Sequence, residues 1–410
     1  MSDHGIVDAL AGGLLFTPDY GRSILLPTTH ILLPHKEVMT EQNAGAIATI
    51  VAQNVHLSSS DQKFTVFGRP IDGPSMADIS YQSLTPRHSW LSGRNIGIAK
   101  AYVHYLKSAS QPDLVEVHGR AQVARYICQR RPDLPVVLYL HNDPREMKGS
   151  RNTQQRAWLM RHLAGIICVS EYIKSCFLEG LTTETSDSTK ICAVLNGTKR
   201  HLDATQPKQN RMLIIGRMVP EKGILPACRA IAQVLAEHSD WGLDVVGGRH
   251  FKTERPSAYE IQIEKALAPI KEQVSLHGFQ PSSVTRALQN KAAISIVPSL
   301  WAEPCGLTGL EALAAGSALL TTDRGGIPEY ATGRANIIKL TGTELNNTAA
   351  EQTFVNKLAD QLHLLITNKA LREELQHRAW ADFPFTAENM VVNTAKARQV
   401  FLSRFTNQTL

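Results

Sequence analysis

Glu303 and Glu311 stand with seven residues between them, on either side of a loop that contains Pro and Gly. Residues 293–297 form an apolar run that predicts a buried strand, and the Ala- and Leu-rich residues after the loop predict a helix. This order of strand, loop and helix is the repeating unit of an α/β fold, whose ligands bind at the carboxyl ends of the strands. Glu303 should lie in the loop and Glu311 about one turn into the helix, so that one ligand could contact both carboxylates.

The loop between the two glutamates offers donors as well as acceptors. The first backbone amides of a helix have no partner within the helix, and Gly306 and Gly309 let a ligand approach them closely. These amides suit phosphate oxygens or sugar hydroxyls, and an ionised carboxylate can accept two hydroxyls of a vicinal diol. The alternative is that both glutamates only complement the positive end of the helix dipole.

A second strand-and-loop segment supplies positive charge. Residues 212–215 predict a strand, Gly216 and Arg217 follow it, and Lys222 stands five positions after the arginine. An Arg fork and a Lys point charge can together bind two phosphates. The segment is not a Walker loop, because the order Gly-Lys-Ser/Thr is absent. The alternative is a pair of solvated surface charges.

Two histidines are expected at the carboxyl ends of two strands of one sheet. Residues 113–117 and 136–140 predict strands, and His118 and His141 follow them directly. Because the carboxyl ends of parallel strands face the ligand crevice, both histidines are candidate site residues. The alternative for each is a satisfied polar residue of an ordinary loop.

Together these segments resemble the retaining family-four glycosyltransferases of the GT-B fold, which carry a signature of Glu, seven residues and Glu, and a Gly-Arg and Lys-Gly element. The resemblance covers residues 211–330 and 113–197 best and the first 110 residues least. Cys305 stands where these enzymes usually have Phe, which would change the wall of the donor pocket. The two histidine segments look like those of the spore-coat SA-like branch.

The resemblance implies a role for each candidate residue. The residues at the reacting centre would be His118, Glu303, Arg217 and Lys222. The donor would be held by Gly45, Gly216, Cys305, Gly306, Leu307, Thr308 and Glu311. The acceptor would lie against His141, Asn142 and Asp143. Cations and helix amides can stabilise the charge of a departing nucleotide diphosphate, so we expect neither a metal ion nor a cofactor.

The chain has 410 residues, more than one hydrophobic core usually serves, so two domains are expected. The resemblance implies two Rossmann-like α/β domains that face a cleft. The acceptor-side domain would cover residues 1–200, with an extension at 1–28, and the nucleotide-sugar domain 201–385. A helix at 386–410 would cross back onto the first domain. Residues 72–94 predict an irregular acceptor-side loop, and residues 354–380 predict one helix.

The net charge of +6 favours an acidic partner, either a nucleotide diphosphate or an anionic membrane face, although a merely soluble basic surface explains it equally well. The six cysteines include no Cys-x-x-Cys pair, which fits a reduced cytoplasm. No apolar run is long enough to span a bilayer, and the first residues lack the features of a signal peptide. We expect a cytoplasmic protein without a nucleic-acid partner, and peripheral contact with the inner membrane is an open alternative.

The expected activity is transfer of a sugar, with retention, from a nucleotide-diphosphate sugar to a glycan or lipid-linked acceptor in cell-surface polysaccharide or lipopolysaccharide synthesis. Two alternatives stay open. A nucleotide-sugar epimerase or hydrolase can share the same fold. A non-catalytic coat or structural protein could keep a relic of the site, but Arg217, Lys222, Glu303 and Glu311 are all intact.

Overall fold

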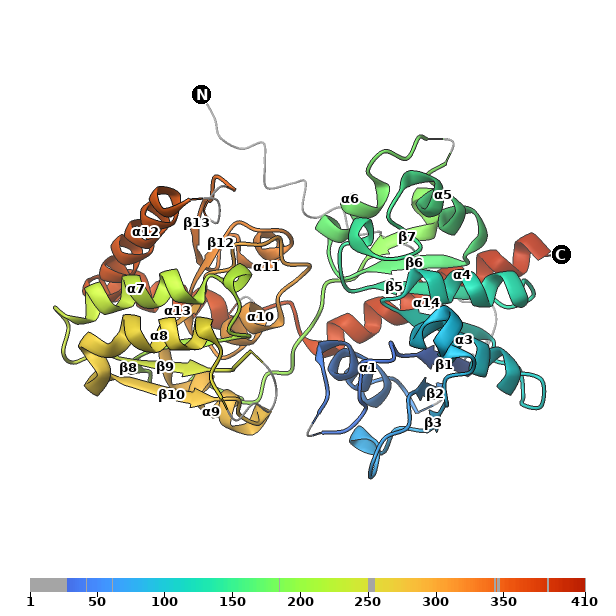
Figure 1. Cartoon of the computed structure of the whole chain (residues 1–410), viewed down its shortest axis with the longest axis horizontal. Coiled ribbons are helices and arrows are strands. Elements are labelled where there is room, and N and C mark those ends of the chain that lie inside the picture. The colour runs from blue at the N-terminus through green and yellow to red at the C-terminus, as the bar shows by residue number, and fades with distance from the viewer. Residues whose placement is uncertain are drawn as a thin grey trace.

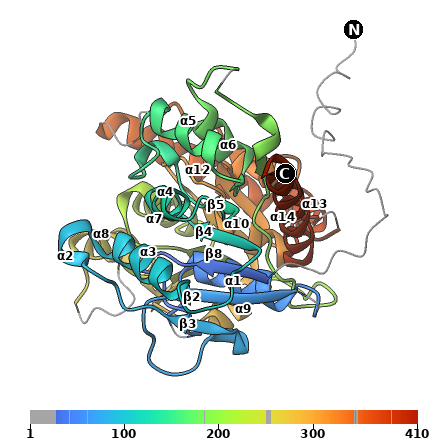
Figure 2. The ribbon, with the colours of Figure 1, turned by 90° about the vertical axis from the view of Figure 1, so that its right-hand side faces the viewer.

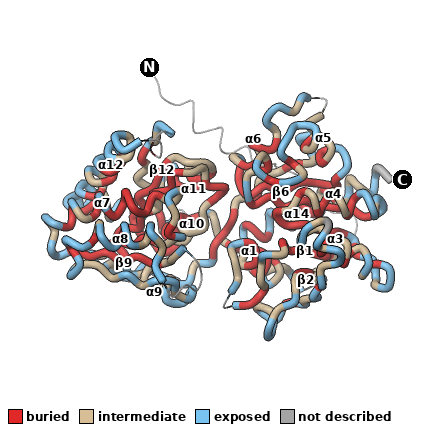
Figure 3. The backbone as a smooth tube through the Cα atoms, in the orientation of Figure 1, coloured by how far each residue is buried: buried red, intermediate tan, exposed pale blue. Residues whose placement is uncertain are grey.

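The computed structural model describes residues 28–41, 43–60, 62–183, 185–249, 255–342, 344, 347–381 and 383–409. Within these residues the chain forms two α/β domains, each built on a parallel sheet (Figure 1). Buried residues gather in the strands and on the inner sides of the helices (Figure 3). The extension expected at residues 1–28 lies outside the described residues, apart from Thr28 at the start of the first strand.

The N-terminal domain has a seven-stranded sheet in the order β3-β2-β1-β4-β5-β6-β7. Strands β4, β5 and β6 are buried along their whole length, which explains why their sequences are almost continuous apolar runs. The strands are β1 (Thr28–Leu32), β2 (Lys63–Gly68), β3 (Tyr81–Ser83), β4 (Leu114–His118), β5 (Val136–Leu140), β6 (Gly165–Cys168) and β7 (Ile191–Ala193). The helices are α1 (Ala46–His56), α2 (Ser89–Ser92), α3 (Arg94–Tyr105), α4 (Ala121–Arg130), α5 (Thr153–His162) and α6 (Glu171–Leu178).

The C-terminal domain has a six-stranded sheet in the order β10-β9-β8-β11-β12-β13. Its strands are β8 (Gln209–Ile215), β9 (Gly242–Val246), β10 (Val274–Gly278), β11 (Ala292–Val297), β12 (Ala318–Thr322) and β13 (Asn336–Ile338). Its helices are α7 (Ile224–Leu235), α8 (Ala258–Leu267), α9 (Ser282–Lys291), α10 (Leu307–Ala314), α11 (Ile327–Ala331), α12 (Thr348–Thr367) and α13 (Lys369–Ala381).

The strand order reverses at the same place in both sheets. Strand β1 pairs with β2 on one side and β4 on the other, and β8 pairs in the same way with β9 and β11. In open parallel sheets the crevice for ligands forms at the carboxyl ends of the strands beside such a reversal. The fold therefore directs attention to the loops that follow β1, β4, β8 and β11.

The last helix, α14 (Ala387–Thr409), returns to the N-terminal domain, as expected from the sequence (Figure 1, Figure 2). A backbone bridge between Thr198 and Thr386 brings the chain back beside the segment by which it left that domain. The helix then packs against α1 and β6. Phe401 lies directly over Gly165, where a Cβ atom would stand only 2.2 Å from the phenyl ring. A glycine at the start of β6 is thus what lets α14 lie against the sheet.

Two segments differ from their predicted structure. Residues 72–94 contain the edge strand β3 and the short helix α2, because Tyr81 and its neighbours pair with β2 despite their polar sequence. Residues 354–380 form parts of two helices, α12 and α13, which are separated at Asn368. The Asn368 side chain accepts a hydrogen bond from the Leu371 amide, so this residue caps the second helix. The apolar periodicity continues across the break and therefore did not reveal it.

Replacing Phe401 with alanine is expected to destabilise the N-terminal domain by about 3 to 5 kcal/mol, because a buried aromatic ring is lost from the contact with β6. Chemical unfolding followed by tryptophan fluorescence would measure the change. Val392→Ala is the matched control, since Val392 lies on the same helix but is 51% exposed. Equal effects of the two substitutions would contradict the packing assigned to Phe401.

Candidate active site

A cavity of about 470 Å³ lies between the two domains. Its walls come mainly from segments that follow the carboxyl ends of β1, β5, β8 and β11. The lining includes these residues expected from the sequence: His141, Asn142, Gly216, Arg217, Lys222, Glu303, Cys305, Gly306, Leu307 and Thr308. The other expected residues, Gly45, His118, Asp143 and Glu311, are not among the lining residues. Most of the donor-side candidates therefore line the cavity. Of the acceptor-side candidates, His141 and Asn142 line it and Asp143 does not.

Glu303 and Lys222 form an ion pair at the cavity wall. Lys222 Nζ lies 2.5 Å from Glu303 Oε1, and Ser299 Oγ donates a hydrogen bond of 2.7 Å to the same oxygen. Lys222 ends a short 3-10 turn, η5 (Pro220–Lys222), and Gly223 follows with a φ of 66°. A Cβ on Gly223 would stand 1.9 Å from the Pro298 carbonyl oxygen. Glycine at this position therefore lets the loop after β8 contact the loop after β11, which brings the two charges together.

The cavity also receives the start of helix α10. Gly306 is the N-cap residue, with a φ of 76°, and no side chain caps this end of the helix. The first amides of α10 are consequently available to a ligand, and the helix dipole makes the position attractive for an anion. Arg217 is exposed and, within the part of the chain that the structure describes, forms no ion pair. Arg217, Lys222 and the helix start thus give one wall of the cavity a positive character.

Cys305 occupies the position that departs from the usual family pattern. Its side chain is 1% exposed and borders the cavity. Burial raises the pKa of the Cys305 thiol to about 12, so the group stays protonated at neutral pH. It therefore forms a small, uncharged part of the cavity wall.

Glu311 does not share the cavity with Glu303. Gln289 of α9 donates a hydrogen bond of 3.0 Å to Glu311 Oε2, and burial raises the pKa of this carboxyl group. Helix α10 begins at Leu307, so Glu311 lies one turn further along, as predicted, but its carboxylate meets α9. The expectation that one ligand spans both glutamates stays a prediction.

The two histidines occupy successive layers. His141 lines the cavity, whereas His118 lies behind it and is 1% exposed. His118 Nδ1 is 2.8 Å from His141 Nε2, and the two rings stack at 5.0 Å together with Tyr139. His118 is the last residue of β4 and pairs with Tyr139 across the ladder, so it stays within the sheet. His141 is the first residue after the end of β5, and this position outside the strand places it at the surface of the cavity. The structure therefore places His141, rather than His118, at the cavity wall.

Behind His118 lies a buried ion pair that the sequence analysis missed. His118 Nε2 is 2.7 Å from Glu116 Oε1, and Arg398 of α14 binds Glu116 through two hydrogen bonds of 2.7 and 2.8 Å. Burial alone would raise the pKa of Glu116, but the charge and hydrogen bonds of Arg398, with the bond from His118, hold it below its ordinary value. A charged residue within an apolar strand was the available signal, since a buried carboxylate requires a partner.

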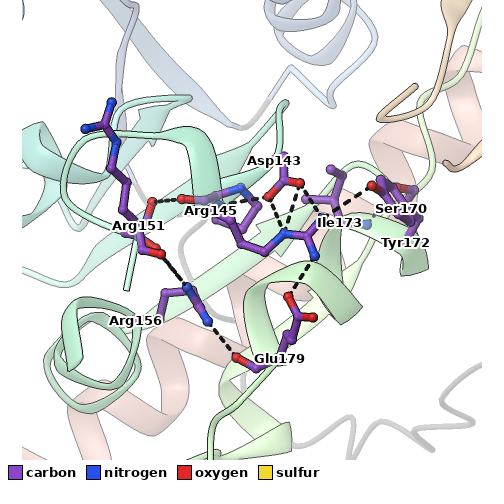
Figure 4. A network of polar contacts seen from close by, with 10 residues as sticks. Asp143, Arg145, Arg151, Arg156, Ser170, Tyr172, Ile173 and Glu179 are labelled. Atoms are coloured by element: carbon purple, nitrogen blue, oxygen red, sulfur yellow. Dashed lines mark hydrogen bonds and ion pairs between the residues drawn. The ribbon is translucent and has the colours of Figure 1, made fainter. Parts of the chain in front are cut away.

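Asp143 belongs to a different network. Its carboxylate accepts hydrogen bonds from the backbone amide and the guanidinium of Arg145, and Arg145 also binds Glu179 (Figure 4). These bonds close the 3-10 turn η3 (Pro144–Glu146) and connect it with the end of α6. Of the three expected acceptor-side residues, His141 and Asn142 reach the cavity, and Asp143 shapes the loop that carries them.

Gly45 is the N-cap residue of α1, but a carboxylate of the protein lies against it. Glu37 Oε2 accepts a hydrogen bond of 3.2 Å from the Ala48 amide, and a Cβ on Gly45 would stand 2.6 Å from the same oxygen. Glu37 itself lines the cavity, and burial raises the pKa of its carboxyl group. The start of α1 is therefore partly satisfied by Glu37, a residue that carried no recognisable signal in the sequence.

The described residues contain no group of three or more His, Cys, Asp or Glu side chains placed to hold a metal ion. They also contain no helix with the length and apolar character needed to cross a bilayer.

Comparison with known proteins identifies the two domains. Residues 52–198 match the family Glycosyltransferase Family 4, and residues 199–380 match the family Glycosyl transferases group 1. The putative glycosyltransferase YtcC of Bacillus subtilis (strain 168) is 26% identical over 53% of this chain, and the match spans only 57% of that relative. The lipopolysaccharide 1,2-N-acetylglucosaminetransferase of Salmonella typhimurium is 25% identical over 70% of this chain and 74% of its own length. Spore coat protein SA of Bacillus subtilis is 24% identical over 54% of this chain and 62% of its own length.

Solved structures show the same fold. Anabaena Alr3699/HepE in complex with UDP and glucose superposes with a TM-score of 0.69 over 90% of this chain and 99% of that chain, at 15% identity. Sucrose-phosphate synthase from Thermosynechococcus elongatus superposes with a TM-score of 0.68 over 92% and 99%, at 16% identity. The two family matches together account for residues 52–380, and the chain therefore carries a domain that matches Glycosyltransferase Family 4 followed by a domain that matches Glycosyl transferases group 1, in two Rossmann-like domains with the GT-B fold.

Proposed function

We propose that this chain transfers a sugar from a nucleotide-diphosphate sugar to a glycan or lipid-linked acceptor, with retention, in cell-surface polysaccharide synthesis. The observation that carries the proposal is the positive wall of the cavity, where Arg217, Lys222 and the start of α10 come together. The complex of HepE with UDP and glucose and the lipopolysaccharide transferase among the relatives support the class of donor and of product.

On the donor side, the chemistry required is stabilisation of a leaving group. As the bond from the sugar to the diphosphate breaks, negative charge grows on the phosphate oxygens, and Arg217, Lys222 and the α10 amides can stabilise it. Glu303 keeps Lys222 in place before the donor arrives. Lys222 and Ser299 both bind Glu303 Oε1, which leaves Oε2 to accept a sugar hydroxyl, since no described side chain donates to it.

On the acceptor side, His141, Asn142 and Glu37 line the wall that belongs to the N-terminal domain. Retention does not need a base placed for inverting attack, so we assign these groups to binding and orientation of hydroxyls. The proton of the acceptor hydroxyl would pass to the departing phosphate. Peripheral association with the cytoplasmic face of a membrane belongs to this proposal as well, and the net charge of +6 supports it.

Incubation with labelled nucleotide sugars, selected by a thermal-shift screen, tests the activity. Transfer of label to an oligosaccharide or lipid-linked acceptor, with the anomeric configuration of the donor preserved in the NMR spectrum of the product, is the expected result. An epimerised donor or free sugar alone would instead establish an epimerase or hydrolase. Absence of nucleotide-sugar binding would favour the relic site of a non-catalytic protein.

Arg217→Ala and Lys222→Ala are each expected to weaken binding of the free nucleotide diphosphate about 10- to 100-fold, because a charge-assisted hydrogen bond to phosphate contributes about 1.5 to 3 kcal/mol. Isothermal titration calorimetry measures the affinity. Arg229→Ala is the control, since Arg229 lies in the same domain but pairs with Glu351 outside the cavity. Wild-type affinity in the first two variants would rule out the phosphate site.

Glu311→Gln is expected to raise the donor KM with little change in kcat, because we assign Glu311 to the ribose of the nucleotide. Gln289 takes one oxygen of this carboxylate and leaves the other for a hydroxyl. Steady-state kinetics and thermal unfolding of one preparation distinguish the alternatives. A lower melting temperature with an unchanged KM would assign Glu311 to the packing of α10 on α9.

Transfer is expected to continue in the presence of EDTA, because side-chain cations and helix amides supply the positive charge in the proposed mechanism. The rate should stay within about twofold of the untreated enzyme when the donor concentration is well above its KM. Loss of activity that Mg²⁺ or Mn²⁺ restores would contradict the metal-independent mechanism.

A further inference from the structure

A continuous chain of buried polar groups connects helix α14 with the cavity. It runs from the Arg398 guanidinium to the Glu116 carboxylate, then to the His118 ring and finally to the His141 ring. The exposed fractions are 5%, 0%, 1% and 8% in the same order, so only the last member approaches the cavity. Arg398 and His141, the two ends of this row of polar groups, are separated by more than half of the polypeptide, because Arg398 comes after both domains.

The donor and acceptor in each contact follow from the ionised state of Glu116. Arg398 holds the pKa of Glu116 down despite burial, so the carboxylate can only accept hydrogen bonds. His118 must therefore carry its proton on Nε2, which faces Glu116. In a neutral His118 ring Nδ1 then has a lone pair, and it must accept a hydrogen bond from Nε2–H of His141.

The alternative is a protonated His118 that donates from both nitrogens. The charges of Glu116 and Arg398 cancel, so a further proton would leave a net positive charge in a layer that water does not reach. Burial is the main reason that the pKa of His141 lies well below its ordinary value. His141 is consequently neutral, and its Nδ1 has no hydrogen-bond partner among the described residues.

We propose that Arg398, Glu116 and His118 are positioning residues that fix His141 in the tautomer with its proton on Nε2, so that Nδ1 presents a lone pair to a sugar hydroxyl in the cavity. The identity of the ligand in this inference rests on the proposed sugar transfer. The tautomer of His141 does not depend on it. The hydroxyl can belong to the donor or to the acceptor, and the kinetic constants distinguish these sources.

Arg398 determines which group donates and which accepts in each hydrogen bond between Glu116 and His141. An uncompensated carboxylate beside His118 would favour its protonation, and the charged ring would then donate to His141 Nε2. The proton of His141 would have to move to Nδ1, which would turn the group facing the cavity from an acceptor into a donor. With Arg398 present, the series of hydrogen bonds orients His141 without making it a strong base. A weakly basic His141 suits a reaction in which the departing phosphate takes the proton.

The first experiment reads the tautomer directly. Long-range ¹H–¹⁵N spectra of the full chain with ¹⁵N-labelled histidine distinguish protonated from unprotonated ring nitrogens, and the His141→Gln spectrum identifies the signals of His141. The expected result is an unprotonated Nδ1 and a protonated Nε2 in the wild type, and the reversed pattern in Arg398→Met. A proton on Nδ1 of His141 in the wild type would overturn the proposal.

The second experiment measures the consequence for the reaction and does not depend on Arg398→Met, in which an unpaired buried carboxylate can prevent folding. His118→Phe keeps a ring between Tyr139 and His141 but removes the hydrogen bonds. It is expected to lower kcat/KM about 10- to 100-fold, with the Kd of the free nucleotide diphosphate unchanged. A higher KM for the donor or for the acceptor identifies the hydroxyl that His141 binds.

Two further variants of α14 complete the test. Arg398→Lys keeps the positive charge and should retain the wild-type tautomer and a larger part of the activity than His118→Phe. Arg404 lies on the same helix and donates a hydrogen bond of 2.7 Å to the Thr189 carbonyl, so Arg404→Ala removes a contact of α14 away from His141 and should leave tautomer and kinetics unchanged. Wild-type kinetics in His118→Phe would overturn the positioning role. If His141 carries its proton on Nε2 but the protein binds nucleotide sugars and transfers none, only the proposed function is contradicted.

Discussion

Both sheets are parallel throughout, and this constraint determines where the site can form. Every strand of a parallel sheet ends on the same edge, and the helices that connect the strands cover the two faces. In this chain the two sheets turn those edges toward a common cavity, so that loops distant in sequence meet there. His141 follows β5 in one domain and Glu303 follows β11 in the other, yet both line the same space. The position of the loops is thus a property of the fold, and only their side chains are particular to the reaction.

Charges close to the site are held in pairs whose members come from different segments. Lys222 and Glu303 pair at the cavity wall with side chains 22% and 6% exposed, so an incoming phosphate can compete for the lysine. Arg398 and Glu116 pair where nothing from the cavity reaches them. An isolated buried ion costs several kcal/mol, and removing one partner therefore destabilises the other. The same physical interaction serves as an exchangeable contact in the first case and as a permanent support in the second.

The parallel α/β architecture and the return of the last helix could be predicted from the sequence, because apolar runs, turn residues and the resemblance point to the same elements. The cation and glutamate segments could be placed at the cavity for the same reason, since they directly follow apolar strands. What the sequence did not show was the depth of a side chain. His118 and His141 both stand at strand ends, and a difference of one residue in where the strand stops separates the ring behind the cavity from the ring that lines it.

Glu37, Glu116 and Arg398 were missed for a related reason. The contact between Glu116 and Arg398 spans 282 positions, and Glu37 reaches the Ala48 amide 11 positions away across a loop, and no local pattern indicates either contact. Asp143 and Gly45 failed to reach the cavity because nearby groups, Arg145 and Glu37, satisfy or cover them first. Sequence reasoning located the loops correctly and could not decide among neighbouring polar residues within them.

The two walls of the cavity also depend on each other. Ser170 of the N-terminal domain donates a hydrogen bond of 2.5 Å to the Pro304 carbonyl, directly beside Glu303. Glu329 of the C-terminal domain accepts hydrogen bonds of 2.8 Å from the amides of Glu171 and Tyr172 at the start of α6. The backbone that carries Glu303 is therefore held in part by the opposite domain. His141 in turn is oriented through a residue of α14, which follows the C-terminal domain in the chain. Each wall thus obtains its geometry from a segment that belongs to the other half of the sequence, and the complete site exists only when both domains are in place.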